Sequence, residues 1–167
     1  MQTARGFQNT LTLAGAGPVR YLLFGSIDFQ LDLGMTAQED DLLYFRSQIV
    51  LHSRLARIEP PVDGVTTDIH SVERVQADTL RARRLGFSGK MCIHPKQVPV
   101  VNECFTPTAE EEAWARRVVE ASAGALGAAI SVDGKMVDRP VLARAEAILA
   151  IAAQFRQRRA VADNDQR

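Results

Sequence analysis

Short apolar runs that alternate with amphipathic segments are the feature that most limits what this chain can fold into. Residues 19–24 form an apolar run, and residues 62–67 and 89–94 are two further predicted strands. Residues 39–57 carry apolar side chains near helical spacing, and residues 71–85 are a second predicted helix. The first run is continuous, as in strands buried on both faces of a parallel sheet. Because short connections between alternating strands and helices are typical of parallel βα units, the sequence predicts an α/β fold.

Proline, glycine and serine mark the ends of these elements. Pro60 and Pro61 end the first predicted helix, because the residue before a proline disfavours helical angles. Ser71 can cap the second helix, which stops at Gly86. Pro95 ends the third strand.

The last third of the chain predicts a helix followed by a hairpin. The run Thr108-Ala109-Glu110-Glu111 is a capping box that opens a helix closing near Gly124. Residues 129–132 and 135–137 flank Asp133-Gly134, a pair that favours the positive φ angles of a type I′ turn. We therefore expect a two-stranded antiparallel hairpin here.

A final helix is predicted to begin after Pro140. Its apolar face consists of Val141, Leu142, Ala145, Ile148, Leu149 and Ala152. From about Gln157 onward the residues are polar, and we expect this end to fray.

The composition excludes several classes of protein. The 20 Lys and Arg residues balance the 20 Asp and Glu residues, which argues against a nucleic-acid or membrane-surface partner. No apolar run approaches the ~20 residues that span a bilayer, so we expect a cytoplasmic protein. The two cysteines, Cys92 and Cys104, imply neither a disulfide framework nor a metal site, and Cys92 is predicted to be buried in the third strand.

Several blocks of the sequence, in order, resemble the citrate lyase β-subunit family, within the broader group of HpcH/HpaI-type aldolases and CoA-ester lyases. The blocks are residues 2–6, 25–34, 43–47, 65–69, 85–97 and 132–140. The resemblance covers residues 1 to about 150. It implies a (β/α)8 TIM-type barrel that binds Mg²⁺ and makes or cleaves a carbon–carbon bond in a 3-hydroxyacyl thioester of CoA.

The resemblance also implies that the chain holds only part of this fold. A complete barrel needs about 250 residues, and residues 2–6 resemble the end of the fifth strand, so the predicted strands would be the sixth to the eighth. We expect residues 1–105 to form the C-terminal half of a barrel, 106–155 a helix–hairpin–helix lid that serves oligomerisation, and 156–167 a polar tail. A half barrel has open sheet edges that another chain must cover, so we expect a homo-oligomer.

The resemblance places a metal site at Asp28 and Gln2. Asp28 follows the first predicted strand, on the face where barrel active sites lie, and stands at the position of a family metal ligand. From spacing alone, a helix-capping role for Asp28 is the alternative. Gln2 stands where the family has a Glu; its amide oxygen can coordinate Mg²⁺ but brings no negative charge. Ile27 likewise replaces an acidic residue common in the family.

Three further residues receive roles from the resemblance. Asp138 corresponds to a lid aspartate that handles a proton in a neighbouring subunit's active site, the alternative being a cap of the final helix. His94 and Pro95 border the region that binds the CoA thioester, the alternative being a hydrogen-bonded structural histidine. Arg46, inside a helix, is better explained by an ion pair or a surface position than by substrate binding, and Asp63 is interpreted as structural.

The expected function is that of a magnesium-dependent carbon–carbon lyase subunit. It would act on citryl-CoA- or malyl-CoA-like 3-hydroxyacyl thioesters by retro-aldol (Claisen-type) cleavage. Two alternatives stay open: a noncatalytic acyl-CoA-binding or assembly protein, and an inactive fragment of a longer lyase. The sequence does not decide whether this chain is an enzyme.

Overall fold

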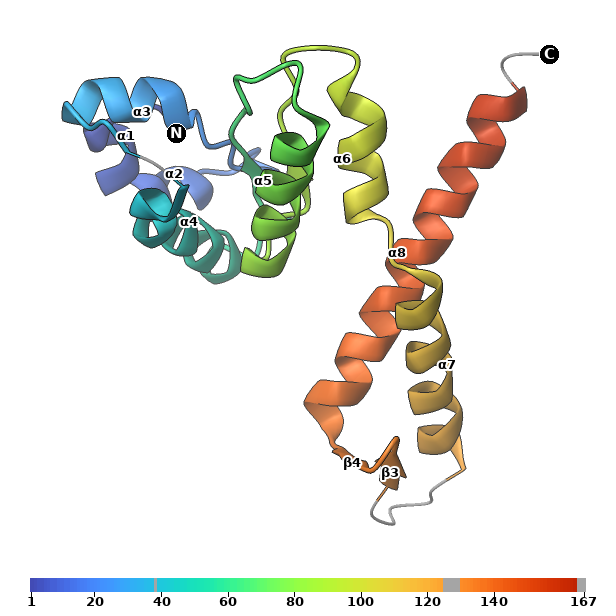
Figure 1. Ribbon diagram of the computed structural model, residues 1–167. Coiled ribbons are helices and arrows are strands. Elements are labelled where there is room, and N and C mark those ends of the chain that lie inside the picture. Colours follow the sequence, from blue (N-terminus) through green and yellow to red (C-terminus); the bar gives the residue numbers. More distant parts are fainter. Residues whose placement is uncertain (38, 125–129, 165–167) are drawn as a thin grey trace. The chain divides into compact units, whose positions relative to one another are not determined.

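The computed structural model describes residues 1–37, 39–124 and 130–164, and it divides the chain into two compact units (Figure 1). Unit 1 spans Met1–Phe105 and unit 2 spans Thr106–Arg167. Unit 1 combines helices with short parallel strands, which confirms the α/β class. None of the described helices is long and apolar enough to cross a membrane.

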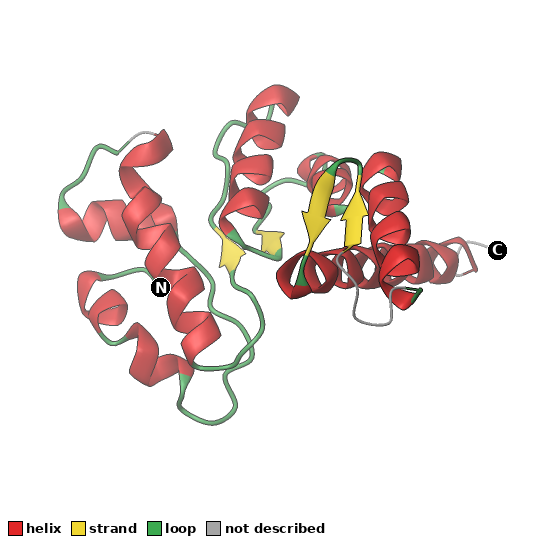
Figure 2. Ribbon diagram, turned by 90° about the horizontal axis from the view of Figure 1, so that it is seen from below, coloured by secondary structure: helices red, strands yellow, loops and turns green. Residues whose placement is uncertain are grey.

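Unit 1 contains helices that were not predicted, but between residues 43 and 90 its helices and strands alternate as predicted. The elements are α1 (Ala4–Gln8), α2 (Thr10–Ala14), α3 (Ser26–Leu33), the 3-10 helix η1 (Glu39–Leu42), α4 (Leu43–Leu55), β1 (Val62–Asp63), α5 (Val72–Leu85), β2 (Gly89–Lys90) and α6 (Gln97–Phe105). Figure 2 shows β1 and β2 side by side.

The three predicted strands are parallel neighbours, but they are shorter than predicted. Val62 pairs with Gly89, and Leu23 forms an isolated parallel bridge to Val62. The amide of Phe24 donates to the Val62 carbonyl at 3.0 Å. After Asp63 the backbone leaves the ladder and passes close to α3: a Cβ on Gly64 would lie 2.3 Å from Ser26 Oγ. Each predicted strand therefore pairs with its neighbour over only one or two residues.

The run at residues 19–24 was also predicted to be buried on both faces, and this is wrong. Leu22 and Phe24 are 5% and 0% exposed, whereas Tyr21 and Leu23 are 40% and 45% exposed. The helices of unit 1 pack on the face of Leu22 and Phe24, and among the described residues nothing buries the opposite face. Cys92 was predicted inside the third strand, but it follows β2 and is only half-buried.

An aromatic core joins the strand at residues 19–24 to α3 and α4. Phe29 of α3 is fully buried, with its ring centroid 5.4 Å from that of Phe24 and 4.7 Å from that of Phe45. Burying a phenylalanine side chain stabilises a fold by about 1.5–3 kcal/mol. This packing fixes the start of α3, and therefore Asp28, relative to the strand.

Local signals set the ends of α5 as predicted. The Ser71 hydroxyl accepts a hydrogen bond from the Arg74 amide at 3.1 Å. At the other end, Gly86 adopts a φ of 100°, a left-handed conformation that suits glycine.

Unit 2 contains α7 (Ala109–Ala123), β3 (Ile130–Val132), β4 (Lys135–Val137) and α8 (Arg139–Asn164). The capping box is present: the Glu111 amide donates to Thr108 Oγ1 at 3.1 Å, and the Thr108 amide donates to Glu111 Oε2 at 2.9 Å. The hairpin is antiparallel, with φ angles of 51° at Asp133 and 73° at Gly134, which confirms the type I′ turn. Ala129, predicted as the first hairpin residue, lies outside the described residues.

The final helix differs from the prediction at its end. The sequence predicted fraying from about Gln157, but α8 continues to Asn164. Glutamine, arginine and alanine, which are frequent here, are good helix formers. In addition, Arg156 Nη1 lies 2.7 Å from Glu112 Oε2 of α7, which holds this part of α8 against its neighbour.

Candidate active site

Gln2 and Asp28, the two predicted metal ligands, are in direct contact. Gln2 Nε2 donates a hydrogen bond to Asp28 Oδ2 at 2.7 Å. Asp28 lies in the first turn of α3, where a negative charge is favoured by the helix dipole. Both side chains are exposed to solvent. The structure therefore brings together two residues that are far apart in the sequence.

The N-terminal segment is held against the strand that precedes α3. The Met1 amino group donates to the Leu23 carbonyl, and the Gly25 amide donates to the Met1 carbonyl at 2.9 Å. The Ala4 amide donates to Asp32 Oδ2 at 2.7 Å. These bonds fix the backbone on both sides of Gln2.

Gly25 gives the Gln2 side chain the space to reach Asp28. A Cβ on Gly25 would lie 2.4 Å from Gln2 Cγ, closer than real side chains approach each other. Glycine is therefore needed here because another side chain passes directly over the backbone. This requirement is visible only in the folded structure.

The pair can offer two oxygen ligands to a cation. Mg²⁺ commonly takes one or two carboxylates from the protein and completes its shell with water and substrate oxygens. Asp28 supplies one carboxylate, and Gln2 can supply Oε1 if its amide turns its NH₂ group away from Asp28. Among the described residues there is no group of three or more His, Cys, Asp and Glu that could hold a metal. The residues fit a Mg²⁺ site with few protein ligands.

His94 and Pro95 form the turn that leads into α6. His94 Nδ1 accepts a hydrogen bond from the Lys96 amide at 3.1 Å, and the Pro95 carbonyl accepts one from the Val98 amide at 3.1 Å. These bonds agree with the structural alternative for His94. The described contacts do not join either residue to Gln2 or Asp28, and their role in binding a thioester stays a prediction.

Asp138 caps α8 in unit 2. Its Oδ1 accepts a hydrogen bond from the Val141 amide at 3.0 Å, and its carbonyl accepts one from the Leu142 amide at 3.0 Å. This is the capping role that spacing alone favoured. The side chain is exposed, and its catalytic role stays a prediction.

A buried ion pair lies on the helix side of the sheet. Arg46 Nε of α4 is 3.0 Å from Asp63 Oδ1 of β1, and the two side chains are only 7% and 0% exposed. Lys90 Nζ of β2 donates to the Gly64 carbonyl at 2.6 Å. Burial lowers the pKa of Lys90, and the charges of Asp63 and Asp78 partly offset this effect. The ion pair agrees with one of the two alternatives for Arg46 and the burial of its side chain excludes the other, a surface position. The buried Asp63 agrees with its structural interpretation.

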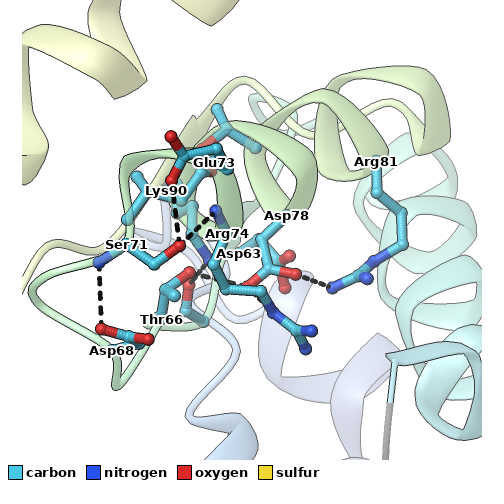
Figure 3. Close-up of polar contacts among 12 residues, drawn as sticks. Asp63, Thr66, Asp68, Ser71, Glu73, Arg74, Asp78, Arg81 and Lys90 are labelled. Atoms are coloured by element: carbon cyan, nitrogen blue, oxygen red, sulfur yellow. Dashed lines mark hydrogen bonds and ion pairs between the residues drawn. The ribbon is translucent and has the colours of Figure 1, made fainter.

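Asp78 is the centre of a second polar cluster, which sequence reasoning missed (Figure 3). Its carboxylate accepts hydrogen bonds from Thr66 Oγ1 and from Arg81 Nη2, both at 2.8 Å, and Arg74 Nε lies 3.5 Å away. Burial raises the pKa of Asp78, but the Thr66 hydrogen bond and the nearby cations outweigh burial, so the pKa lies below its ordinary value of 3.8. The spacing 74, 78, 81 along one helix face was the signal available in the sequence.

A cleft of about 580 Å³ lies in unit 1 beside the start of α3. Residues from α3, α4, α5 and the loop after β1 line it, including Ser26, Ile27, Arg46, Thr67, Arg74 and Arg81. Ile27 is the neighbour of Asp28 in the sequence. The cleft therefore adjoins the segment that carries the Gln2–Asp28 pair.

Comparison with known proteins identifies one family. The sequence model described as HpcH/HpaI aldolase/citrate lyase matches residues 1–95. The chain is 37% identical over 155 residues to the citrate lyase subunit beta-like protein of Deinococcus radiodurans, covering 90% of this chain and 54% of that protein. It is 33% identical over 142 residues to the mitochondrial citramalyl-CoA lyase of Rattus norvegicus, covering 82% of this chain and 42% of that protein.

A solved structure shares the fold. It is that of protein CitE from Mycobacterium tuberculosis in complex with magnesium, acetoacetate and coenzyme A. It is 37% identical and superimposes with a TM-score of 0.80, covering 90% of this chain and 58% of that chain. The present chain thus spans about half the length of the relatives that it matches.

Proposed function

Since this chain belongs to the HpcH/HpaI aldolase/citrate lyase family, we propose that it is a magnesium-dependent carbon–carbon lyase subunit. Its substrates are citryl-CoA- or malyl-CoA-like 3-hydroxyacyl thioesters, which it cleaves by a retro-aldol (Claisen-type) reaction. The observation that carries the proposal is the 2.7 Å contact between Gln2 and Asp28. These are the positions to which the family resemblance assigns the metal.

The residues of the site have distinct tasks. Asp28 and the Gln2 amide oxygen would hold Mg²⁺, which would act as a Lewis acid towards negative charge on the enolate oxygen of the substrate. Asp138 moves a proton at the acyl or enolate carbon in a neighbouring subunit. The turn at His94 and Pro95 borders the thioester. The complex of CitE with magnesium, acetoacetate and coenzyme A supports this choice of ligands.

A second chain completes the site in this proposal. The sheet face that carries Tyr21 and Leu23 is exposed. We propose that unit 1 is the C-terminal half of a barrel, that unit 2 is its lid, and that copies of the chain associate in the cytoplasm. Covering the open sheet edges favours association.

One observation favours a second candidate, a noncatalytic acyl-CoA-binding or assembly protein. Gln2 donates an N–H to Asp28, so the carboxylate is satisfied without a cation. A glutamate at this position would instead repel Asp28 and require one. Gln2 in place of the family's glutamate is thus compatible with a fold that no longer depends on metal.

Titration calorimetry with Mg²⁺, on protein whose mass in solution is measured in parallel, tests the proposal. We expect one site that disappears in Asp28→Ala, followed by cleavage of a 3-hydroxyacyl-CoA by the Mg²⁺-loaded protein. An Asp40→Ala variant controls for the loss of an exposed carboxylate elsewhere. A folded oligomer that binds acyl-CoA but neither binds Mg²⁺ nor cleaves thioesters would instead establish the noncatalytic candidate.

A further inference from the structure

Three arginines line the cleft beside α3, and one of them, Arg46, is ion-paired with the buried Asp63. The charged residues that line this cleft are Arg46, Arg74, Arg81, Asp68 and Asp78. Arginine is suited to carboxylate and phosphate because its planar guanidinium presents paired N–H donors. We propose that this cleft binds an oxyanion, either a carboxylate or a phosphate, at a site distinct from the Gln2–Asp28 pair.

The two lining carboxylates are already engaged. Asp78 accepts hydrogen bonds from Thr66 and Arg81. Asp68 Oδ1 accepts from the amides of His70 and Ser71, at 2.9 and 3.0 Å. Both oxygens of Asp78 and one oxygen of the exposed Asp68 are therefore already hydrogen-bonded, which weakens their repulsion of an entering anion.

Arg81 retains donors for a ligand. Its described bond uses Nη2, whereas a guanidinium has five N–H donors. Its Nε is buried and has no hydrogen-bond partner among the described residues. A buried donor without a partner is unfavourable, so an acceptor brought by a ligand would stabilise this arrangement.

Ser26 adds a second, independent donor. The residue is 4% exposed and lines the cleft, yet no hydrogen bond of its hydroxyl is described in the structure. Thr67 also lines the cleft, on the loop after β1. The site thus combines guanidinium groups from α4 and α5 with hydroxyls from α3 and this loop.

Ile27 makes the proposal testable at one position. It lines the same cleft and is 48% exposed, so a polar side chain can replace it without burial of a new charge. Ile27→Glu places an internal carboxylate in the cleft, where it competes with an oxyanion for the arginines. Ile27→Gln has the same size without the charge and serves as the matched control.

The experiment is a titration of ¹⁵N-labelled protein with inorganic phosphate and, separately, with acetate. It is performed with EDTA, so that Mg²⁺ binding does not contribute, and at ionic strength held constant with chloride. We expect a saturable shift of the Arg81 Nε–Hε signal. Saturation with phosphate alone, with acetate alone or with both identifies the class of ligand.

The variants decide whether the site is the cleft. Ile27→Glu should weaken binding about tenfold, as expected for a negative charge added next to a bound anion, while Ile27→Gln binds as the native protein does. Arg74→Gln should weaken binding as well, and it decides the matter if Ile27→Glu does not fold. No shift beyond that caused by chloride, or equal binding by the glutamate and glutamine variants, would overturn the proposal.

Discussion

At the scale of single residues, the choice between an amide and a carboxylate at position 2 decides the charge of the candidate site. The two side chains have nearly the same shape, but only the amide can donate to Asp28, as it does at 2.7 Å. The amide stabilises the metal-free protein, whereas a carboxylate would favour a bound cation. The affinity for Mg²⁺ and the stability without Mg²⁺ are therefore expected to change in opposite directions.

Gln2→Glu should raise the affinity for Mg²⁺ by about tenfold or more, since a second carboxylate joins the site. In EDTA the same variant should melt at a lower temperature than the native protein, because the introduced carboxylate and Asp28 would repel each other. Calorimetry and thermal unfolding measure the two effects. Gln8→Glu adds a charge on the exposed surface of α1 and controls for net charge; equal Mg²⁺ affinity of the two variants would contradict the assigned ligand positions.

Asp78 gives unit 1 a defined dependence on acid. Its folded-state pKa lies below 3.8, so its ion pairs and hydrogen bond stabilise the fold above that pH and are lost as the pH falls through the folded-state pKa. Asp78→Asn should lower the free energy of unfolding by about 1–3 kcal/mol at pH 7, and the difference should shrink as the pH falls below 3.8. Urea unfolding followed by circular dichroism at both pH values measures this. An Asp40→Asn variant that behaves in the same way would argue against a special role of Asp78.

At the scale of secondary-structure elements, the predictions succeeded where the signal is local. The cap of α5 at Ser71, the capping box of α7 and the turn at Asp133-Gly134 each depend on neighbouring residues, and each is present. The sequence analysis did not anticipate α1, α2, α3 and α6. The first two helices are only five residues long, and helices this short depend on tertiary contacts that a local pattern does not contain.

The limits of local sequence patterns also explain which contacts of the candidate site were not predicted. Gln2 and Asp28 were named from separate blocks, but their contact requires Gly25 to lack a side chain, which depends on the fold. The pairing of Arg46 with Asp63 crosses from a helix to a strand, and the sequence left an ion pair or a surface position open for Arg46 without naming a partner. The strands were predicted too long because an apolar run does not reveal how many of its residues find a partner in the ladder.

Thr108→Ala should destabilise unit 2 by about 1 kcal/mol, because α7 loses the side-chain bond to its first turn. Thr108→Ser keeps the hydroxyl and should be close to the native protein. Trp114, the only tryptophan in the chain, lies in α7, so fluorescence reports on the unfolding of this unit. Equal losses in the two variants would mean that the methyl group of Thr108, rather than its hydroxyl, is what matters.

At the scale of the whole molecule, the uncovered side of the parallel sheet favours association. Tyr21 and Leu23 are 40% and 45% exposed, and exposed apolar surface of this kind marks interaction sites. The prediction of a homo-oligomer follows from this surface.

Leu23→Lys should weaken self-association by about tenfold, since a charge would be buried at the interface. Sedimentation equilibrium measures the change in the association constant. The side chain of Leu23 is exposed while its backbone forms the bridge to Val62, so the fold should survive the substitution. Leu51→Lys, on the exposed side of α4, is the control. Should the native protein be a monomer at high concentration, a homo-oligomeric enzyme is excluded.

The parallel pairing in unit 1 also has a consequence for synthesis on the ribosome. Val62 leaves the ribosome well before Gly89, its partner in β2, whereas β3 and β4 emerge almost together. At about 5–20 residues per second, β1 waits on the order of seconds for its neighbour, while a hairpin closes in about 1–10 μs. During that interval the incomplete sheet exposes an unpaired edge and an apolar face. We therefore expect chaperones near the ribosomal exit tunnel to bind the growing chain.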